Sequence, residues 1–386
     1  MTPVYDLAVI GGGVMGLFTA YYGATPGKKV VILERSRVGD PQTASFGLTR
    51  SIRNDYLDPL YAKLAFAARQ LWLELQAQTP ERFLIECGCL NLAKADITPA
   101  LEDTYAEQSH QVLTGLHLRT QSFTRQGLQS RYPQFDADLG RLDVEAGVLY
   151  LPVITQTLLA ALHSHGVTIE ERTIVETITP HGREVRIQTN LGERRARSLV
   201  VAAGIGTNAV LDRIDGCALQ FPILQDRPSQ TKYFIPPDNQ RDLFVAGTLP
   251  VFAYLDVGVY GHPILEGRTP GVKIGYYNPP DVQRIKTRIA SVEAFVEECM
   301  PALRGARSVD VKEVDQCSYD LISDDNFILG LLPGFQNIAV GVGWRGTGYK
   351  FAPLIGRTLA ELALKGRSEH AINRFSPARF VSADVG

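Results

Sequence analysis

The sequence feature that most constrains the fold is a strand, a glycine-rich turn and a helix near the N-terminus. Residues 5–10 are rich in apolar and β-branched types, which predicts a buried parallel strand. Gly11, Gly13 and Gly16 follow in the G-x-G-x-x-G spacing, and an apolar helical face continues to residue 22. Such glycines permit a sharp turn, a close approach to a pyrophosphate and tight helix–strand packing. The pattern predicts that phosphates bind at the N-terminus of this helix.

A second apolar segment and an acidic residue support a dinucleotide site. Residues 29–33 predict another buried strand, which ends at Glu34, eighteen residues beyond Gly16. A carboxylate at about this distance is expected to bind a ribose hydroxyl of the cofactor. The alternative is an ordinary strand–helix–strand unit in which Glu34 is a surface residue.

Length and composition exclude several classes of protein. A chain of 386 residues predicts two domains, and 45% hydrophobic and 21% charged residues are typical of a soluble globular protein. The net charge of -2 disfavours a nucleic-acid partner, and no apolar run approaches the roughly 18 residues that span a bilayer. We expect no secretory signal, because Asp6 interrupts the first apolar run. Dispersed cysteines without ligand spacing predict free thiols in the cytoplasm and no metal site.

Apolar periodicity predicts the remaining elements. Helices are expected over residues 59–75, 98–113, 122–132, 152–166, 291–298 and 351–364. Strands are expected over residues 83–93, 167–170, 174–178, 185–189, 199–204, 232–235, 251–254, 257–260, 272–276 and 337–343. The strand at 199–204 ends in a glycine, where the carboxyl edge of a sheet would face a cofactor.

The C-terminal region repeats the geometry of the first motif. A strand at 337–343 leads into a glycine-rich turn at 344–350 and then a helix, whose N-terminus offers a second site for an anionic group. A nucleotide fold built from both chain ends is the layout of FAD proteins with an inserted substrate domain. We therefore predict an α/β protein with a Rossmann-type, glutathione-reductase-like FAD-binding domain (1–80, 146–218, 318–386). The substrate domain (81–145, 219–317) would be α+β, on a mixed or antiparallel sheet.

Three basic residues stand out between these motifs. Arg50 and Arg53 are three apart, so they would share one side of a helical turn or turn-like segment, either as solvated charges or as ligands of anionic groups. Lys273 lies inside an apolar strand. The side chain of Lys273 lies either on the solvent-exposed face of that strand or in a desolvated position beside a reactive ring.

The chain resembles the monomeric sarcosine oxidase family of FAD-dependent amine oxidases, which includes N-methyltryptophan oxidase and pipecolate oxidase. The likeness covers nearly the full length and is carried by several motifs in the same order. These motifs are the first glycine turn and residues 49–53, 260–263, 272–276, 316–319, 325–328 and 346–350.

The resemblance implies covalently bound FAD. The family attaches its flavin through a cysteine in a Cys-x-Tyr segment, which Cys317 matches; the alternative for Cys317 is a buried structural thiol. Lys273 matches a lysine over the flavin that helps to activate oxygen, and Arg50 matches an arginine beside the ring. The implied cofactor-binding residues are Gly11, Gly13, Val14, Met15, Gly16, Glu34, Arg35, Ser45, Thr49, Arg50, Val175, Ala203, Gly204, Cys317, Gly343, Gly346, Thr347, Gly348, Tyr349 and Lys350.

The resemblance also implies a substrate site. Arg53 and Lys350 match the pair that binds the substrate carboxylate, and Tyr260 matches a tyrosine over the substrate. The chain departs from sarcosine oxidases at Phe46 and Tyr277, where those enzymes have histidines.

Further departures occur in the last glycine turn. Trp344, Arg345 and Thr347 stand where sarcosine oxidases have a smaller aromatic residue, a serine and a histidine. Trp344 and Tyr277 therefore imply a flatter, more aromatic substrate pocket, for which oxidases of cyclic imino acids or imines, such as the one in nikkomycin biosynthesis, are an analogy.

We expect an FAD-dependent oxidase of the C–N bond of a secondary or cyclic amino acid, giving an imine and hydrogen peroxide. The expected catalytic residues are Lys273, Arg50, Tyr260 and Tyr277, and the expected substrate-binding residues are Arg53, Lys350, Trp344 and Arg345. The expected partners are a small amino acid and molecular oxygen, with neither nucleic acid nor membrane, for a monomer. The alternatives are a dehydrogenase that uses an electron carrier, an NAD-dependent dehydrogenase and a non-catalytic flavin-binding protein.

Overall fold

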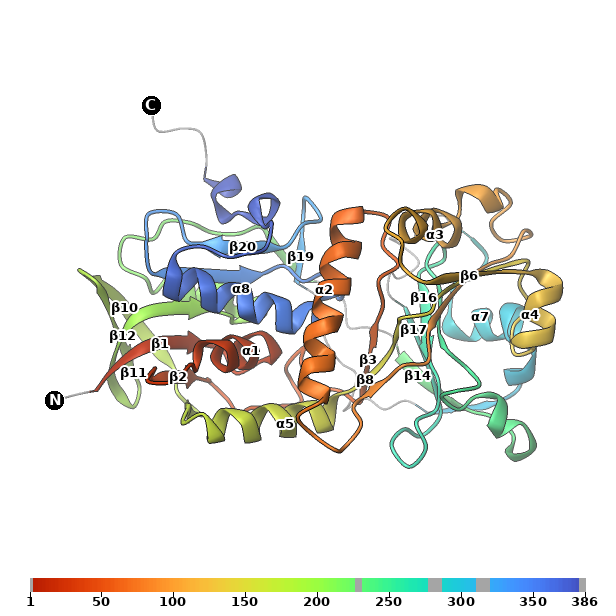
Figure 1. Ribbon diagram of the computed structural model, residues 1–386, viewed down its shortest axis with the longest axis horizontal. Helices are drawn as coiled ribbons and strands as arrows, with labels where there is room; N and C mark the ends of the chain where they lie inside the picture. Colours follow the sequence, from red (N-terminus) through yellow and green to blue (C-terminus); the bar gives the residue numbers. More distant parts are fainter. Residues whose placement is uncertain (1–2, 226–230, 277–286, 310–319, 382–386) are drawn as a thin grey trace. The chain divides into compact units, whose positions relative to one another are not determined.

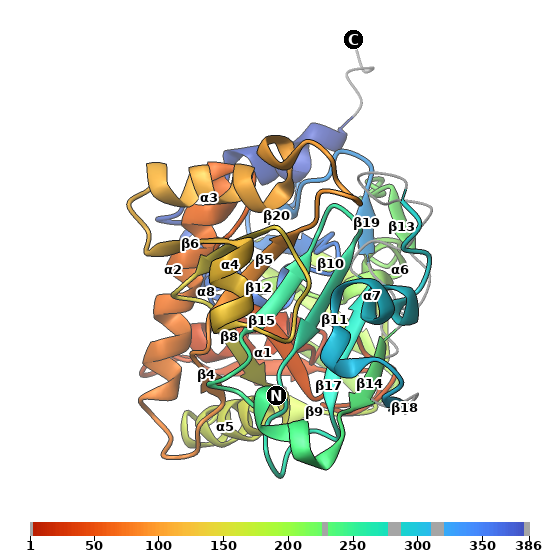
Figure 2. The same cartoon turned by 90° about the vertical axis from the view of Figure 1, so that its right-hand side faces the viewer.

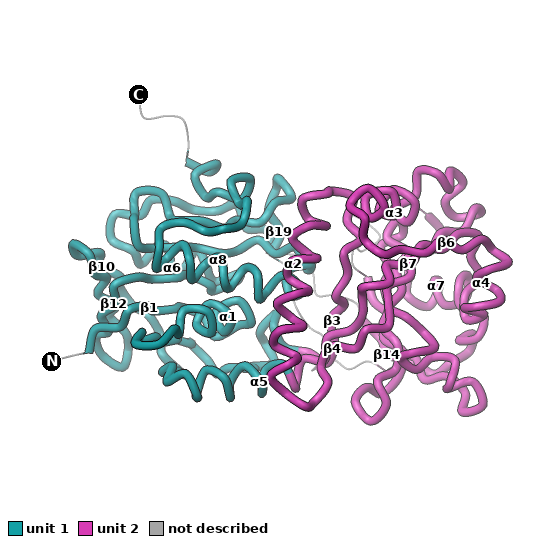
Figure 3. The backbone as a smooth tube through the Cα atoms, viewed as in Figure 1, with its two compact units in different colours: residues 1–46, 154–228, 317–386 teal, residues 47–153, 229–316 magenta. Residues whose placement is uncertain are grey.

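The computed structural model describes residues 3–225, 231–276, 287–309 and 320–381. Contacts between Cα atoms divide the chain into two compact units (Figure 3). Unit 1 comprises Met1–Phe46, Ile154–Pro228 and Cys317–Gly386, and unit 2 comprises Gly47–Val153 and Ser229–Gln316. Both units are discontinuous in sequence, and both ends of the chain belong to unit 1.

Unit 1 is built on an eight-stranded sheet with a parallel centre. The parallel strands are β1 (Val4–Ile10), β2 (Val30–Leu33), β9 (Thr168–Glu170), β12 (Gly192–Val201) and β21 (Ile338–Val342). The antiparallel strands are β10 (Val175–His181), β11 (Glu184–Thr189) and β20 (Ile328–Leu331). The central strands β1, β2 and β21 are almost wholly apolar because both faces of a parallel sheet are covered.

Two helices from opposite ends of the chain pack together in unit 1 (Figure 1). They are α1 (Val14–Gly23) and α8 (Ala352–Lys365). A Cβ atom at Gly356 of α8 would overlap Phe18 of α1, so the glycine permits the close approach of the two helices. Unit 1 also contains α5 (Leu151–Ser164), most of which lies in it, α6 (Thr207–Leu211), and a small antiparallel pair, β13 (Ile223–Gln225) and β19 (Asp320–Ile322).

Unit 2 is built on an eight-stranded, mainly antiparallel sheet. The strands in spatial order are β18 (Arg307–Val309), β14 (Thr231–Ile235), β17 (Val272–Tyr276), β16 (Val259–His262), β15 (Val251–Tyr254), β5 (Cys89–Ala93), β7 (Leu139–Asp143) and β6 (Thr120–Thr124). A second sheet contains β3 (Thr49–Ile52), β8 (Gly147–Tyr150) and β4 (Leu84–Ile85).

One face of the large sheet of unit 2 carries its apolar core. Phe252 of β15 stacks on Phe295 of α7 (Val292–Cys299) with 6.3 Å between ring centres. Figure 2 shows α7 together with α4 (Arg125–Arg131) over this part of the sheet. The other helices of unit 2 are α2 (Pro59–Gln76) and α3 (Tyr105–Gly115).

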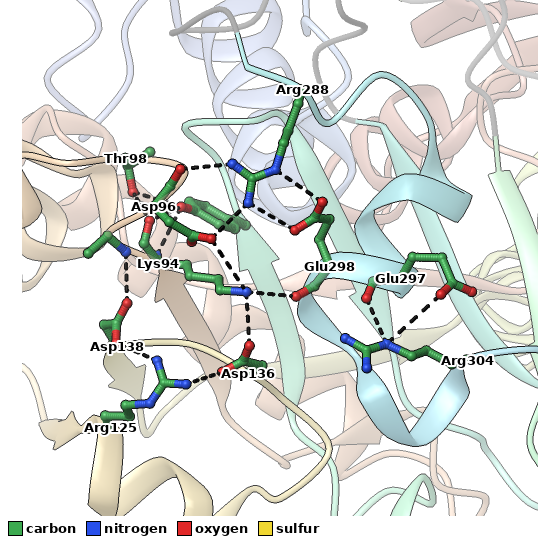
Figure 4. Close-up of polar contacts among 12 residues, drawn as sticks. Lys94, Asp96, Thr98, Arg125, Asp136, Asp138, Arg288, Glu297, Glu298 and Arg304 are labelled. Carbon is green, nitrogen blue, oxygen red and sulfur yellow. Dashed lines mark hydrogen bonds and ion pairs between the residues drawn. The ribbon is translucent and has the colours of Figure 1, made fainter.

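A network of ion pairs joins three segments of unit 2 (Figure 4). Lys94 Nζ lies 2.9 Å from Asp136 Oδ2 and donates to the Glu298 carbonyl oxygen at 3.1 Å. Arg288 Nη2 lies 2.8 Å from Asp96 and 2.9 Å from Glu298. The network links α7 to the loop after β5 and the loop before β7. Because exposed ion pairs contribute little singly, we infer that it fixes the loops rather than stabilises the whole unit.

Several predicted elements differ from the structure. The strand expected at 257–260 is β16, shifted by two residues, and the strand expected at 199–204 is part of β12, which ends at Val201. The strand expected at 83–93 is interrupted at Gly88, whose φ of 78° separates β4 from β5. The helix expected from residue 98 begins only at Tyr105, because the Thr104 side chain caps it by accepting from Glu107 N. The helix expected from residue 122 is preceded by β6, and α4 begins at Arg125.

The boundaries of the two units also differ from the expected domain boundaries. Residues 47–80 and 146–153 were expected in the first domain, but they lie in unit 2. The reason is that β8 pairs with both β3 and β4, which ties these segments into one sheet. Residues 219–228 lie in unit 1, where Phe221 packs into the core.

Within the described parts of the chain, no helix has the length and apolarity to cross a membrane.

Candidate active site

The parallel register of unit 1 brings several loops to one edge of the sheet. Ile10 of β1 is level with Leu33 of β2 and Val201 of β12, and Val201 is level with Val340 of β21. The carboxyl ends of these strands therefore coincide. The carboxyl edge of a sheet is where ligands bind in open α/β folds.

The first glycine turn lies at this edge and is tightly packed. Gly11 has a φ of 110°, and a Cβ atom there would lie 2.5 Å from the carbonyl oxygen of Ala202. A Cβ atom at Gly16 would overlap the carbonyl oxygen of Gly11. Both positions thus require glycine, as the motif predicts. Ser45 Oγ accepts from Val14 N at 2.9 Å and covers the start of α1.

Glu34 is buried at the same edge rather than lying on the surface. Its Oε2 accepts from Gly12 N at 2.6 Å, and its Oε1 accepts from Ser36 N at 2.8 Å. The carboxylate therefore also stabilises the turn, a role that sequence reasoning missed. Thr173 N donates to the Glu34 carbonyl oxygen at 2.8 Å, which brings the start of β10 at Val175 toward the same edge.

Two other predicted cofactor residues lie after β12. Ala203 and Gly204 follow the strand, and Gly204 has a φ of 55° where the chain turns into a short helix. A Cβ atom at Gly206 would lie 3.8 Å from Arg35 Nη1, so Arg35 reaches this turn from the end of β2.

The last glycine turn meets the first one within unit 1. A Cβ atom at Gly348 would lie 3.2 Å from Met15 Cε in α1. Tyr349 lines a small pocket together with Gly12, Val14 and Ser45. Residues predicted from opposite ends of the chain are therefore brought together.

Asp320 fixes the beginning of the last turn and was missed from the sequence. Its Oδ2 accepts from Gly343 N at 2.8 Å, and its carbonyl oxygen accepts from Arg345 N at 3.2 Å. Burial of the carboxyl, opposed by these backbone donors, raises the pKa of Asp320 to about 6. The Arg345 guanidinium lies 2.7 Å from Asp325 Oδ1, so the predicted substrate ligand forms an ion pair at this turn.

Lys350 and Trp344 are buried in this turn. Lys350 Nζ donates to Thr347 Oγ1 at 2.7 Å and to the Thr347 carbonyl oxygen at 3.0 Å. Trp344 packs edge-on against Phe327 with 5.3 Å between ring centres. Gly346 has a φ of 65°, a left-handed conformation that favours glycine at this position.

In unit 2, the large sheet has a polar face opposite its apolar core. Directly opposed residues of paired strands point to the same side of a sheet. Tyr260 and His262 alternate with Gly261, which faces Phe252 and hence the core. Lys273 is opposite His262 across β16 and β17. Tyr260, His262 and Lys273 therefore share the polar face.

Lys273 is buried on this polar face. Its exposed fraction is 2%, and its Nζ donates to the carbonyl oxygen of Thr49 at 3.3 Å. The Thr49 hydroxyl lies 2.8 Å from His262 Nδ1. The structure therefore buries Lys273 and excludes the solvated placement, whereas a reactive ring beside it stays a prediction. His262 was missed, although its alternation with Tyr260 could have placed it on the same face.

The two arginines do not share a helical turn as predicted. Thr49–Ile52 is strand β3, held in extended form by pairing with β8. Arg50 is half-buried and its Nη1 donates to the Thr49 carbonyl oxygen at 3.0 Å. Arg53 follows the strand and is buried, and its Nη1 lies 2.8 Å from Asp55 Oδ1.

The segment that carries Arg53 lies on the polar face of the large sheet. Asn91 of β5 donates to Asp55, and Asp143 of β7 accepts from Asn54 N at 2.6 Å. Asn91 and Asp143 were missed from the sequence, because only the strand pairing brings them under this segment.

Tyr277 and Cys317 lie outside the described residues.

Comparisons with known proteins agree on one family. The model of the family "FAD dependent oxidoreductase" matches residues 6–362. The peroxisomal sarcosine oxidase of Homo sapiens is 28% identical over 396 residues, which cover 98% of this chain and 97% of that protein. The N-methyl-L-tryptophan oxidase of Salmonella dublin is 26% identical over 394 residues, covering 97% and 99%. The structure of L-proline dehydrogenase from P. horikoshii has a TM-score of 0.80 at 19% identity and covers 98% of each chain.

The buried carboxyl of Asp320 predicts a pH dependence of stability. Its pKa is about 6 in the native protein against an ordinary value of 3.8, so the native state holds this proton more tightly than the unfolded chain. The contribution of the Asp320 carboxyl to the free energy of unfolding is therefore greatest below about pH 4 and declines as the pH rises to about 6. Asp320→Asn removes this decline and keeps an oxygen for Gly343 N.

We expect the melting temperature of Asp320→Asn, relative to the unchanged protein, to rise between pH 4 and pH 6 and then to stay level. The shift corresponds to roughly 2–3 kcal/mol at most. Melting curves recorded at half-unit pH steps measure it. A constant difference between the two proteins over this range would contradict the assigned protonation of Asp320.

Proposed function

This chain belongs to the family of FAD-dependent oxidoreductases, and we propose that it oxidises the C–N bond of a secondary or cyclic amino acid. The amine loses two electrons and two protons to become an imine, and oxygen gains them to become hydrogen peroxide. The relatives named sarcosine oxidase and N-methyl-L-tryptophan oxidase, both covered almost end to end, support this substrate class.

The described residues of unit 1 fit a dinucleotide cofactor. Because Gly11 and Gly16 have no Cβ atoms, the turn packs closely against its neighbours. Its backbone N–H groups at the start of α1 would then stabilise a pyrophosphate. Glu34, at the end of β2, is hydrogen-bonded to the same turn and would offer carboxylate oxygens to a ribose hydroxyl. FAD, when bound, supplies the two-electron acceptor for the amine. Tyr349 and Gly348 would cover it from the last glycine turn.

Arg53 is our proposed ligand of the substrate carboxylate. It is 6% exposed, and a buried guanidinium recognises a carboxylate through paired N–H donors. The resemblance to amine oxidases implies that Lys350 also binds the substrate carboxylate. Holding the carboxylate fixes the position of the oxidised carbon, which lowers the entropic part of the barrier. Tyr260 would limit the space beside this carbon.

The buried ammonium group of Lys273 is the observation that favours an oxidase over a dehydrogenase that uses an electron carrier. A fixed positive charge at a water-poor site stabilises the negative charge that develops on oxygen as it is reduced. The Thr49 carbonyl oxygen and the polar face of β16 and β17 hold this charge in place. Arg50 adds a second positive charge on β3.

A direct test is to measure hydrogen peroxide release from sarcosine, N-methyltryptophan, pipecolate and proline. We expect oxygen consumption and peroxide in equal amounts with at least one of these amines. The same amines are assayed without oxygen in the presence of an electron-accepting dye. Turnover with the dye and none with oxygen would identify a dehydrogenase and contradict the oxidase.

Lys273→Met isolates the proposed role of the lysine in oxygen reduction. We expect kcat/KM for oxygen to fall more than tenfold, while kcat/KM for the amine changes much less, because the charge acts on oxygen only. Lys232→Met, on neighbouring β14, is the matched control, since Lys232 pairs with Glu293. An equal fall in both constants for Lys273→Met would contradict this role.

We also propose that the FAD is attached covalently to Cys317. This residue matches the Cys-x-Tyr position of the amine oxidases. Its thiolate would form a C–S bond to the 8α-methyl carbon of FAD in place of one C–H bond. The thiol and methyl hydrogens and the two electrons released would pass to oxygen, which becomes hydrogen peroxide. Acid-precipitated protein should be yellow, and Cys317→Ser should give a white pellet. Cys217→Ser, which removes another thiol of unit 1, is the control and should leave the pellet yellow. A white pellet from the unchanged protein would rule out the covalent bond.

A further inference from the structure

Arg53 already has an anionic partner within its own chain. Its Nη1 donates to Asp55 Oδ1 at 2.8 Å and to the Asp55 carbonyl oxygen at 2.9 Å. The guanidinium carbon lies 4.9 Å from the ring centre of Tyr56 and 5.9 Å from that of Tyr105. A third, longer hydrogen bond runs from Nη1 to the Tyr105 hydroxyl at 3.4 Å. Three hydrogen bonds and two aromatic rings therefore fix the orientation of this side chain.

Asp55 is itself held so that it cannot turn away from Arg53. Its side-chain Oδ2 accepts from Asn91 Nδ2 and faces Cys89 Sγ at 4.0 Å. Its carbonyl oxygen also accepts from the Tyr105 hydroxyl at 2.8 Å. The side chain of Asp55 is wholly buried, so the ion pair with Arg53 is shielded from solvent.

A second buried carboxyl lies next to this pair. Asp143 accepts from Asn54 N at 2.6 Å and from Glu145 N at 3.1 Å. Burial, and then the negative charge of Asp55, raise the pKa of Asp143. Arg53 Nη1, which lies 2.8 Å from Asp55 Oδ1, pairs with the charge of Asp55.

The arrangement has a consequence for any carboxylate that binds Arg53. Within the described chain, the guanidinium hydrogen bonds all start from Nη1, so a ligand would take the Nε–Nη2 edge. The ligand carboxylate and Asp55 would then share one positive charge and repel each other. A ligand that carries its own cation, such as a zwitterionic amino acid, is penalised less than a simple anion.

We propose that Asp55 is a specificity-determining residue that neutralises Arg53 and thereby selects zwitterionic amino acids against simple carboxylic acids. This inference depends on the proposed function, since it takes Arg53 as the carboxylate ligand. The ion pair makes the carboxylate subsite a fixed array of hydrogen-bond donors with little net charge. Simple organic acids would then inhibit weakly.

The test is the binding of acetate and of its neutral analogue acetamide to the holoenzyme, measured by titration calorimetry. Asp55→Asn removes the charge and keeps a side-chain oxygen for Arg53 Nη1. The unpartnered Oδ1 of Asn91 can accept from the new amide if the Asn91 side chain flips. We expect acetate to bind about tenfold more tightly, because a like charge on the order of 6 Å away is removed, and acetamide to bind unchanged.

Arg53→Met separates this inference from the proposed function. If Arg53→Met weakens acetate binding and Asp55→Asn strengthens it, the inference holds. If Arg53→Met weakens it and Asp55→Asn leaves it unchanged or weaker, the inference is wrong and Arg53 remains the carboxylate ligand. If Arg53→Met has no effect, the carboxylate binds elsewhere and both fail. Asp55→Ser, which also removes the charge, serves if the asparagine variant does not fold, with the same expected gain.

Discussion

The close approach of β1 and α1 is the constraint on which the rest of unit 1 depends. The carbonyl oxygen of Gly11 occupies the space that a Cβ atom of Gly16 would need, and Gly11 itself leaves no room for a side chain beside Ala202. This packing places the N-terminus of α1 at the carboxyl edge of the sheet. The carboxylate of Glu34 and the last glycine turn lie around that point.

The large sheet of unit 2 serves two purposes through the alternation of its side chains. One face carries the aromatic core, in which Phe252 stacks on α7. The other carries Tyr260, His262 and Lys273, together with Asn91 and Asp143, and is covered by the segment after β3. Buried charges on such a face persist only when they are paired and hydrogen-bonded, which the contacts of Asp55 and Thr49 achieve.

The sequence was sufficient for features that depend on local pattern. The strand–turn–helix at Gly11, the return of the chain to the same fold at its C-terminus, and the α/β fold class are confirmed. It was insufficient where long-range pairing decides. Residues 49–53 alone suggest a turn, but pairing with β8 makes them a strand. Asp55 follows Arg53 by two residues, yet only the fold shows that they form a buried ion pair.

The assignment of sites from the sequence met a similar limit. Lys273 was open to a solvated or a buried placement, and the register of β16 and β17 decided in favour of burial. Asp320 gave no signal, because its contact with Gly343 joins a residue before β20 to one after β21. Roles for Tyr277 and Cys317 remain predictions, since both lie outside the described residues.

The two ends of the chain have a consequence for biosynthesis. The apolar side of α1 is covered by α8, and β12 receives β21 as its neighbour only when residue 338 and those after it have been made. A ribosome releases the N-terminal region long before its packing partners exist. Contacts between residues so far apart in sequence form slowly, and apolar surface stays exposed until they have formed. Chaperone assistance during synthesis would therefore be of most value for the first 46 residues of this protein.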